Sequence, residues 1–147
     1  MRIVVQRVSE AQVVVAGEVV GKIGKGALVF FAVHKDDDSE KILWLAQKLV
    51  HLRMFHDAQN KMNLSLLDIK AEVLIVSQFT LYANCLGGRR PDFIESATPD
   101  IARPIYDKFV EEVRKLLGHV ETGEFGAYMQ VSLVNDGPVT FIIDAKS

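Results

Sequence analysis

The chain has 147 residues, of which 49% are hydrophobic and 24% charged, and its formal net charge is −2. This length suits one domain with a substantial buried core, and the apolar composition excludes an intrinsically disordered chain. The charge argues against a broad electrostatic grip on nucleic acid, but it is compatible with a local basic patch.

Cysteine usage and the first residues of the chain favour the cytoplasm. Cys85 is the single cysteine, so no disulfide can form within the chain. The first residues run directly into a strand pattern with no signal peptide, and no apolar run approaches the ~20 residues that cross a bilayer. We therefore expect a soluble cytoplasmic protein with one domain over residues 1–147, apolar enough to favour an oligomer.

The N-terminal part is predicted to form strands followed by a helix. Apolar patterns predict strands over residues 3–8, 11–16, 19–23 and 27–33. The acidic run over residues 36–40 is predicted to cap the next helix and to complement its dipole, in preference to a divalent-metal site, because no EF-hand spacing follows. One face of that helix carries apolar residues at helical spacing, namely Ile42, Leu45, Ala46, Leu49 and Val50.

The rest of the chain is predicted to alternate strand and helix. Residues 72–76 form an apolar strand, and a loop over residues 83–96 follows. At residues 98–100 a threonine, a proline and an aspartate predict the start of a helix that ends at Gly118. Residues 128–144 are predicted to form a hairpin-like pair of strands. This order of elements predicts an α/β fold, with mixed β-sheets covered by two main helices.

Two short polar motifs stand at the edges of apolar strands. The first consists of Ser77, Gln78, Phe79 and Thr80, and the second, residues 135–140, contains Gly137 and Pro138. Taken alone, the first motif is typical of loop residues whose side chains form hydrogen bonds with nearby backbone groups, and the second is typical of a turn. In a functional interpretation, the first motif offers backbone N–H groups to a developing oxyanion. The second offers carbonyl oxygens with no bulky side chain before them, and its Gly-Pro bond is a candidate for the cis isomer.

No general base or metal site accompanies these motifs in the sequence. His51 and His56 are five residues apart, the wrong spacing to share a helix face, and the histidine and cysteine spacings of metal sites are absent. Nothing indicates a Ser-His-Asp triad. We therefore predict neither a metal nor a cofactor.

A small basic segment lies in the loop over residues 83–96. Arg89 and Arg90 follow two glycines, which predicts a flexible loop. The arginines are either solvated or in contact with phosphate, which arginine binds with a bidentate fork.

With these residues in view, the chain resembles the D-aminoacyl-tRNA deacylases, also called D-tyrosyl-tRNA deacylases, from end to end. The two motifs in the right order carry the resemblance, with matching segments at residues 6–8, 61–63, 89–91 and 122–125. It implies a barrel-like core of mixed sheets under two main helices, and a homodimer. It also implies hydrolysis of the ester that joins a D-amino acid to the 3′ adenosine of tRNA. Asp92 departs from the family, because a serine commonly follows the Arg-Pro pair there.

The resemblance also assigns roles to residues. It implies that the bond between Gly137 and Pro138 is cis and that their carbonyls reach into the neighbouring subunit's site. There they would hold the α-amino group and exclude an L side chain, so that glycine on tRNA is also accepted. Arg7 is expected to brace the Gly-Pro loop. Phe125 is expected in the adenine pocket, which Met129 also lines.

Two mechanisms follow from the first motif, whose backbone is expected to surround the scissile carbonyl. In one, the tRNA 2′-hydroxyl helps to activate water while main-chain N–H groups near Phe79 and Thr80 stabilise the oxyanion. In the other, Thr80 attacks the ester and forms an acyl-enzyme. We favour the first, because the sequence shows no activator for Thr80. The rival classes are a general esterase, a non-catalytic binder of the aminoacyl-tRNA end and a purely structural dimer.

Overall fold

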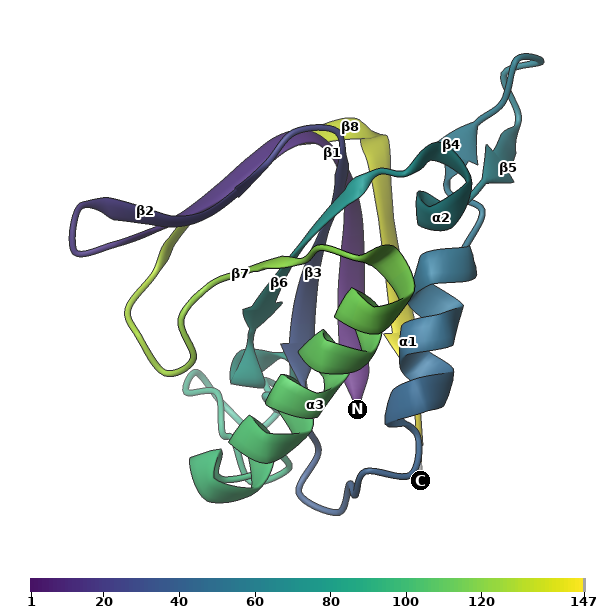
Figure 1. Cartoon of the computed structure of the whole chain (residues 1–147). Helices are drawn as coiled ribbons and strands as arrows, with labels where there is room; N and C mark the ends of the chain where they lie inside the picture. Colours follow the sequence, from purple (N-terminus) through teal and green to yellow (C-terminus); the bar gives the residue numbers. More distant parts are fainter. Residues whose placement is uncertain (147) are drawn as a thin grey trace.

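The computed structural model describes residues 1–146. The main element of the fold is a six-stranded mixed sheet that curls into a nearly closed barrel (Figure 1). The strands run in the order β2-β1-β3-β6-β7, and β8 pairs with the other edge of β1. β3 and β6 are parallel, as are β6 and β7, while the pairs that involve β1 are antiparallel. The strands are β1 (Arg2–Val15), β2 (Glu18–Ile23), β3 (Gly26–Ala32), β6 (Glu72–Ser77), β7 (Glu121–Thr122) and β8 (Gln130–Asp144).

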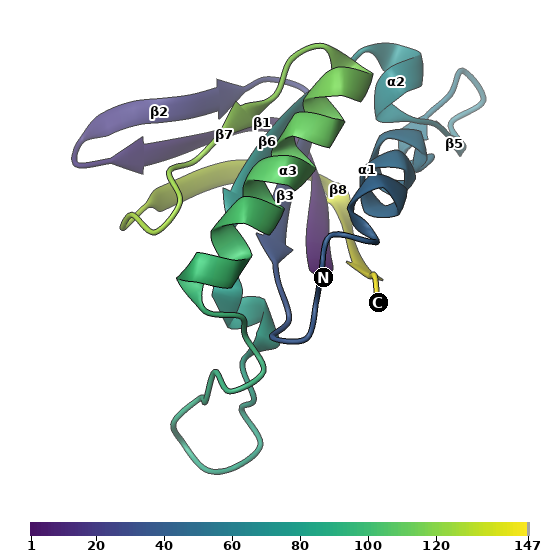
Figure 2. The same cartoon turned by 60° about the horizontal axis from the view of Figure 1, so that its bottom comes forward.

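Two main helices cover one face of this sheet, as the sequence predicts. α1 (Ile42–His51) and α3 (Pro99–Leu117) pack against each other over the sheet (Figures 1 and 2). Between them in the chain come a small hairpin, β4 (Phe55–His56) and β5 (Met62–Leu64), then the short helix α2 (Leu66–Ile69) and a 3₁₀ turn, η1 (Phe79–Tyr82). No helix in the described part of the chain has the length and apolar character needed to cross a membrane.

The hydrophobic core has two parts, one on each face of the sheet. The larger part lies between the helices and the sheet, where residues such as Phe31, Leu45 and Phe109 are fully buried. The smaller part lies on the concave face, where the far half of β1 and β2 fold over β3 and β6. Partly buried apolar residues at the margin of this smaller core are Val15, Phe30, Met129, Val131 and Leu133.

The predicted hairpin over residues 128–144 is wrong, because β8 is one strand that pairs with β1 at both ends. Val8 pairs with Asn135 and Gln6 pairs with Thr140. Between these two pairs β1 advances by two residues and β8 by five, so β8 contains extra residues. The turn-forming residues therefore bulge out of β8 without reversing it. Likewise, the two strands predicted over residues 3–8 and 11–16 are one strand, β1.

The predicted acidic cap of α1 is also wrong. The residue before α1 is Lys41, which makes no side-chain cap, and the first turn holds no acidic residue. Asp37 instead accepts a hydrogen bond from the His34 N–H at 2.7 Å and pairs with the α-amino group of Met1. The acidic residues thus order the loop before the helix. The predicted start of α3 is confirmed, with Pro99 as its first residue.

Candidate active site

The first motif lies where β6 ends and the chain turns away from the sheet. Ser77 is the last residue of β6, and η1 begins two residues later. The buried polar groups of this turn find partners within the fold, as buried backbone groups generally do. Three hydrogen bonds hold the turn: Gln78 N–H to the Phe31 carbonyl at 2.8 Å, the Arg2 guanidinium to the Leu81 carbonyl at 2.9 Å, and the Ser96 hydroxyl to the Phe79 carbonyl at 2.9 Å.

Two adjacent backbone donors remain free at this turn. The first N–H groups of a helical turn have no acceptor inside it, and Phe79 and Thr80 are the first two residues of η1. Within residues 1–146, neither N–H donates to another protein group. Both residues are exposed. The pair is thus available to an incoming oxygen, as the oxyanion interpretation requires.

Thr80 has no base beside its hydroxyl. The Thr80 Oγ1 accepts a hydrogen bond from the Gln78 side-chain amide. In the described part of the chain, no histidine or carboxylate bonds to this oxygen. An amide cannot take the proton of a hydroxyl, so the contact does not activate Thr80 as a nucleophile.

A cavity of about 550 Å³ opens beside this turn. Tyr106 is the only titratable residue among those that line it, and its hydroxyl donates to the Ile75 carbonyl at 3.0 Å. Burial, with a contribution from Asp107, raises the pKa of Tyr106, so this side chain stays neutral at physiological pH. The cavity therefore provides shape and apolar contact without acid–base chemistry. Its lining includes Phe31, Ser77, Gln78, Phe79, Phe93, Ser96, Ala102, Tyr106 and Phe125.

Phe125 forms one wall of the cavity and is held from two sides. Its ring centroid lies 5.6 Å from that of Tyr106, at an interplanar angle of 47°, and the Arg103 guanidinium lies 5.6 Å from the ring. Such aromatic walls suit a flat ligand ring, since aromatic side chains stack on nucleobases. Tyr106 was missed as a site residue because its helical spacing beside Ile105 and Phe109 reads as core.

The second motif forms the bulge of β8. The bond between Gly137 and Pro138 is cis, as the resemblance implies, and both residues are exposed. Arg7 lies beneath them at 5% exposure. Its Nε donates to the Asp136 carbonyl at 2.8 Å, and its Nη1 donates to the Met54 carbonyl at 2.7 Å. Arg7 therefore ties the bulge to the chain segment that follows α1.

Asn135 also shapes the bulge, which the sequence did not indicate. Its side-chain oxygen accepts from the Val139 N–H at 2.8 Å, and its side-chain nitrogen donates to the Val139 carbonyl at 3.2 Å. The amide thus closes the base of the bulge in place of a ladder of backbone hydrogen bonds. The residue order Asn-Asp-Gly-Pro is also typical of an ordinary turn, so only the strand pairing reveals this role.

Replacing Arg7 with methionine is expected to destabilise the fold by about 2 kcal/mol, because two carbonyls lose a charged donor. Methionine keeps an apolar stem of similar length, so the loss reports mainly on the hydrogen bonds. The free energy of unfolding is measured by urea titration. Arg53→Met is the control, since Arg53 is exposed and bonds one side chain; it should change stability by less than about 0.5 kcal/mol. Equal stability of the two variants would contradict the expectation.

One chain does not bring the two motifs together. Ser77, Gln78, Phe79 and Phe125 line the cavity, whereas Thr80, Arg7, Met129, Gly137 and Pro138 do not. Along the sheet, three strand spacings and about four residues separate the bulge from Ser77, or roughly 20 Å. Met129 instead packs against the smaller core, and its Sδ lies 2.6 Å from the point where a Cβ on Gly123 would stand.

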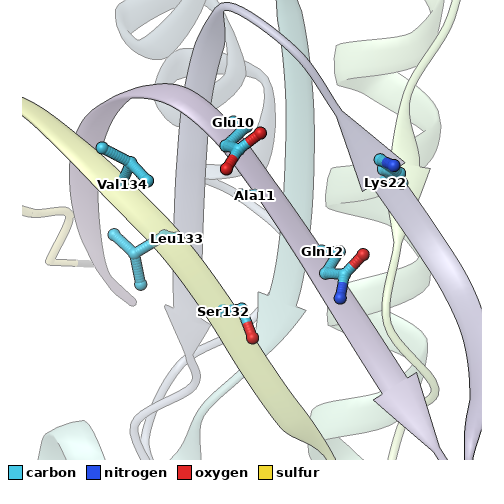
Figure 3. Close-up of a pocket in the computed structure, with 7 residues that line it drawn as sticks. All are labelled: Glu10, Ala11, Gln12, Lys22, Ser132, Leu133 and Val134. Atoms are coloured by element: carbon cyan, nitrogen blue, oxygen red, sulfur yellow. The ribbon is translucent and has the colours of Figure 1, made fainter.

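A second cavity, of about 290 Å³, lies across β1 between β2 and β8 (Figure 3). Glu10 and Gln12 of β1 border it, with Lys22 on one side and Ser132 on the other (Figure 3). No residue of either motif lines it. The cavity beside η1 is therefore the candidate active site.

Comparisons with known proteins identify the family of this chain. Residues 4–144 match the profile of the family described as D-Tyr-tRNA(Tyr) deacylase. D-aminoacyl-tRNA deacylases of Thermosipho africanus, Thermotoga petrophila and Bacillus cereus are 59%, 55% and 51% identical to this chain, over 99% of it and 98%, 98% and 100% of their own lengths. These relatives place the chain in a class of hydrolases that act on aminoacyl-tRNA. The chain belongs to the D-Tyr-tRNA(Tyr) deacylase family.

Solved structures show the same fold. A structure titled c-Myc DNA Unwinding Element Binding Protein superposes with a TM-score of 0.94 at 38% identity, covering all of both chains. A probable eukaryotic D-amino acid tRNA deacylase superposes with a TM-score of 0.89 at 21% identity, over 98% of each chain. The second match concerns the fold alone. The predicted arrangement of a barrel-like mixed sheet under two main helices is thereby confirmed.

Proposed function

We propose that this protein hydrolyses the ester bond between a D-amino acid and the 3′ adenosine of tRNA. The observation that carries the proposal is the free pair of N–H groups on Phe79 and Thr80, beside an aromatic cavity. The cavity takes the adenine ring against Phe125, and the ester carbonyl then lies at the N–H pair. Membership of the deacylase family supports the assignment. A tRNA substrate supports a cytoplasmic location.

The reaction proceeds by attack of water on the ester carbonyl carbon. The ester needs little activation, and the neighbouring 2′-hydroxyl of the ribose assists the transfer of the proton from water. Negative charge develops on the carbonyl oxygen, where each backbone donor stabilises the transition state by roughly 3 kcal/mol. The bond to the 3′ oxygen then breaks, and this oxygen takes the proton. The products are a free amino acid and tRNA with an intact 3′ end.

Selection for the D configuration is assigned to the Gly-Pro bulge of a second copy in a homodimer. Two observations support this arrangement. The bulge is exposed and lies roughly 20 Å along the sheet from the cavity of its own chain. The smaller core also has a partly open margin, and β8 carries exposed apolar residues at Val134 and Ile142. The carbonyls of Gly137 and Pro138 hold the α-amino group and block an L side chain, while glycine has no side chain to exclude.

Replacing Thr80 with alanine is expected to lower kcat by less than about threefold, because the backbone N–H is kept. The Thr80 hydroxyl has an amide neighbour and no base, so it does not act as the nucleophile in the proposed mechanism. Single-turnover rates with D-Tyr-tRNA give the comparison with wild type. A loss of several orders of magnitude, or a covalent acyl-Thr80 adduct in mass spectrometry, would identify Thr80 as the nucleophile instead.

The test of the proposed function is release of amino acid from D-Tyr-tRNA and L-Tyr-tRNA, with enzyme far below substrate concentration. Multiple-turnover cleavage of the D ester alone is the expected result, and glycyl-tRNA is expected to be cleaved as well. Equal cleavage of both stereoisomers would reject the stereochemical role of the bulge. No cleavage of either would reject the hydrolase.

A non-catalytic nucleic-acid binder is the second candidate. It is favoured by the likeness to the protein whose title names binding to a DNA unwinding element, at 38% identity over the whole chain. Such a binder would protect the aminoacyl ester in proportion to its own concentration. Turnover at low enzyme concentration therefore separates the two candidates.

A further inference from the structure

Two arginines stand apart from the other arginines of the chain. The sequence contains seven, all within the described residues. Arg89 and Arg90 are exposed and have no hydrogen-bond or ion-pair partner in residues 1–146. The other five all have partners: a carboxylate for Arg2, Arg103 and Arg114, backbone carbonyls for Arg7, and a side-chain amide for Arg53.

These two arginines lie on a loop with a closed neck. Asn84 and Asp92 exchange two backbone hydrogen bonds, of 2.9 and 3.0 Å, which hold the ends of the loop together. A Cβ added at Gly87 or Gly88 would meet nothing within 4 Å, so the tip stands clear of the rest of the chain. Figure 2 shows the loop extending below the body of the protein. The fold therefore presents two cationic side chains to solvent.

Asp92 does not neutralise this charge. Its Oδ1 accepts a hydrogen bond from the Ile94 N–H at 3.3 Å, and in the described part of the chain it forms no ion pair with either arginine. Residues 84–92 carry two positive charges and one negative, a net of +1, in a chain whose formal charge is −2. The loop is therefore locally positive on a chain that is negative as a whole.

The residue that follows the neck of the loop is part of the cavity wall. Phe93 follows Asp92, lines the cavity and meets the Phe79 ring edge-on, with centroids 5.1 Å apart. From Phe93 to Arg90 the chain spans at most about 10 Å. Stacked nucleotides rise about 3.4 Å each, so this distance corresponds to about three nucleotides. The two arginines are therefore within reach of the nucleotides next to one bound in the cavity.

We propose that Arg89 and Arg90 bind backbone phosphates of the single-stranded 3′ end of tRNA, next to the terminal adenosine. The inference rests on the proposed function, which places that adenosine in the cavity. Guanidinium groups without internal partners bind phosphate in bidentate fashion, and they do so without reading sequence. The loop therefore contributes affinity for the RNA and takes no part in the chemistry at the ester.

The test compares Arg89→Gln/Arg90→Gln with Arg114→Gln/Lys115→Gln. The control also removes two adjacent positive charges, from the far end of α3, where both are paired with glutamates. Two substrates are used: D-Tyr-tRNA and 3′-O-(D-tyrosyl)adenosine, which has the ester but no phosphate. The loop variant is expected to lose about tenfold in kcat/KM on D-Tyr-tRNA, through KM, and nothing on the adenosine ester. A plot of log kcat/KM against log salt concentration is expected to become less steep by about 1.4. Each lost phosphate contact on a single strand accounts for ~0.7 of this change.

Equal losses on both substrates, or an unchanged salt slope, would overturn the proposal. An altered oligomeric mass with unchanged kinetics on tRNA would overturn it too and would assign the loop to a protein contact. Binding of uncharged tRNA, followed by fluorescence anisotropy, separates this proposal from the hydrolase. If wild type binds tRNA without cleaving D-Tyr-tRNA and the loop variant does not bind, the hydrolase fails while the phosphate contact stands.

Discussion

Replacing Phe79 with proline is expected to lower kcat/KM for D-Tyr-tRNA by about 100-fold relative to replacing it with alanine. Both changes remove the aromatic ring, but only proline removes the backbone N–H. Phe79 is the first residue of η1, where proline fits and where no internal hydrogen bond is lost. Gln78 before it has φ −143 and ψ 79, outside the helical region that proline disfavours for its neighbour.

The comparison of Phe79→Pro with Phe79→Ala isolates one N–H group, provided that both variants fold. Melting temperatures of the two should agree within a few degrees. Pre-steady-state rates then show whether the loss lies in the chemical step. Equal rates for the two variants would mean that this N–H does not hold the oxyanion, and the main-chain mechanism would have to be abandoned.

Replacing Gly137 with alanine is expected to lower kcat/KM for D-Tyr-tRNA by more than about 100-fold, because the bulge must change shape. Gly137 has φ +153, and a Cβ there would lie 2.7 Å from both the Cγ2 and the N of Val139. Val139 is buried, so the bulge has to move and the bulge carbonyls move with it. Gly17→Ala is the control, since Gly17 also has positive φ but meets nothing within 4 Å. Full activity of Gly137→Ala would reject a role for the bulge.

Mixing these inactive variants tests whether the site is shared between subunits. A heterodimer of Gly137→Ala and Phe79→Pro subunits has one site with both motifs intact, if the bulge acts across the dimer. Equal mixing gives half heterodimers, so about a quarter of the wild-type activity is expected to return. If each chain uses its own bulge, every site carries one defect and no activity returns.

Local signals in the sequence predicted the elements whose ends are set by nearby residues. The start of α3 at Pro99 follows from the fixed φ of proline and its end at Gly118 from the positive φ that glycine allows, although Thr98 makes no side-chain cap. The prediction of an acidic cap on α1 failed because Asp37 binds the nearby His34 N–H and the Met1 amino group instead. Charge near a helix start does not reveal which group a carboxylate will bind.

The candidate site was predicted in part. The sequence did not reveal the residues that other elements, distant in the chain, bring to it. Ser77, Gln78 and Phe79 were found because they follow a strand, and Phe125 was assigned through the resemblance. Phe31, Phe93 and Tyr106 line the same cavity from other elements, and their own patterns indicate only core or loop. The bulge of β8 was taken for a turn because its partner strand lies more than a hundred residues away. Pairing of such distant segments leaves no local trace.

The pairing of β1 with β8 also has a consequence for synthesis of the protein. β1 begins at Arg2, and the strand that covers one of its edges begins only at Gln130. At the usual 5–20 residues per second, a nascent chain carries that edge uncovered for on the order of ten seconds. Uncovered strand edges pair readily with other chains. A growing polypeptide of this kind is therefore a natural client for chaperones at the ribosome until its last strand emerges.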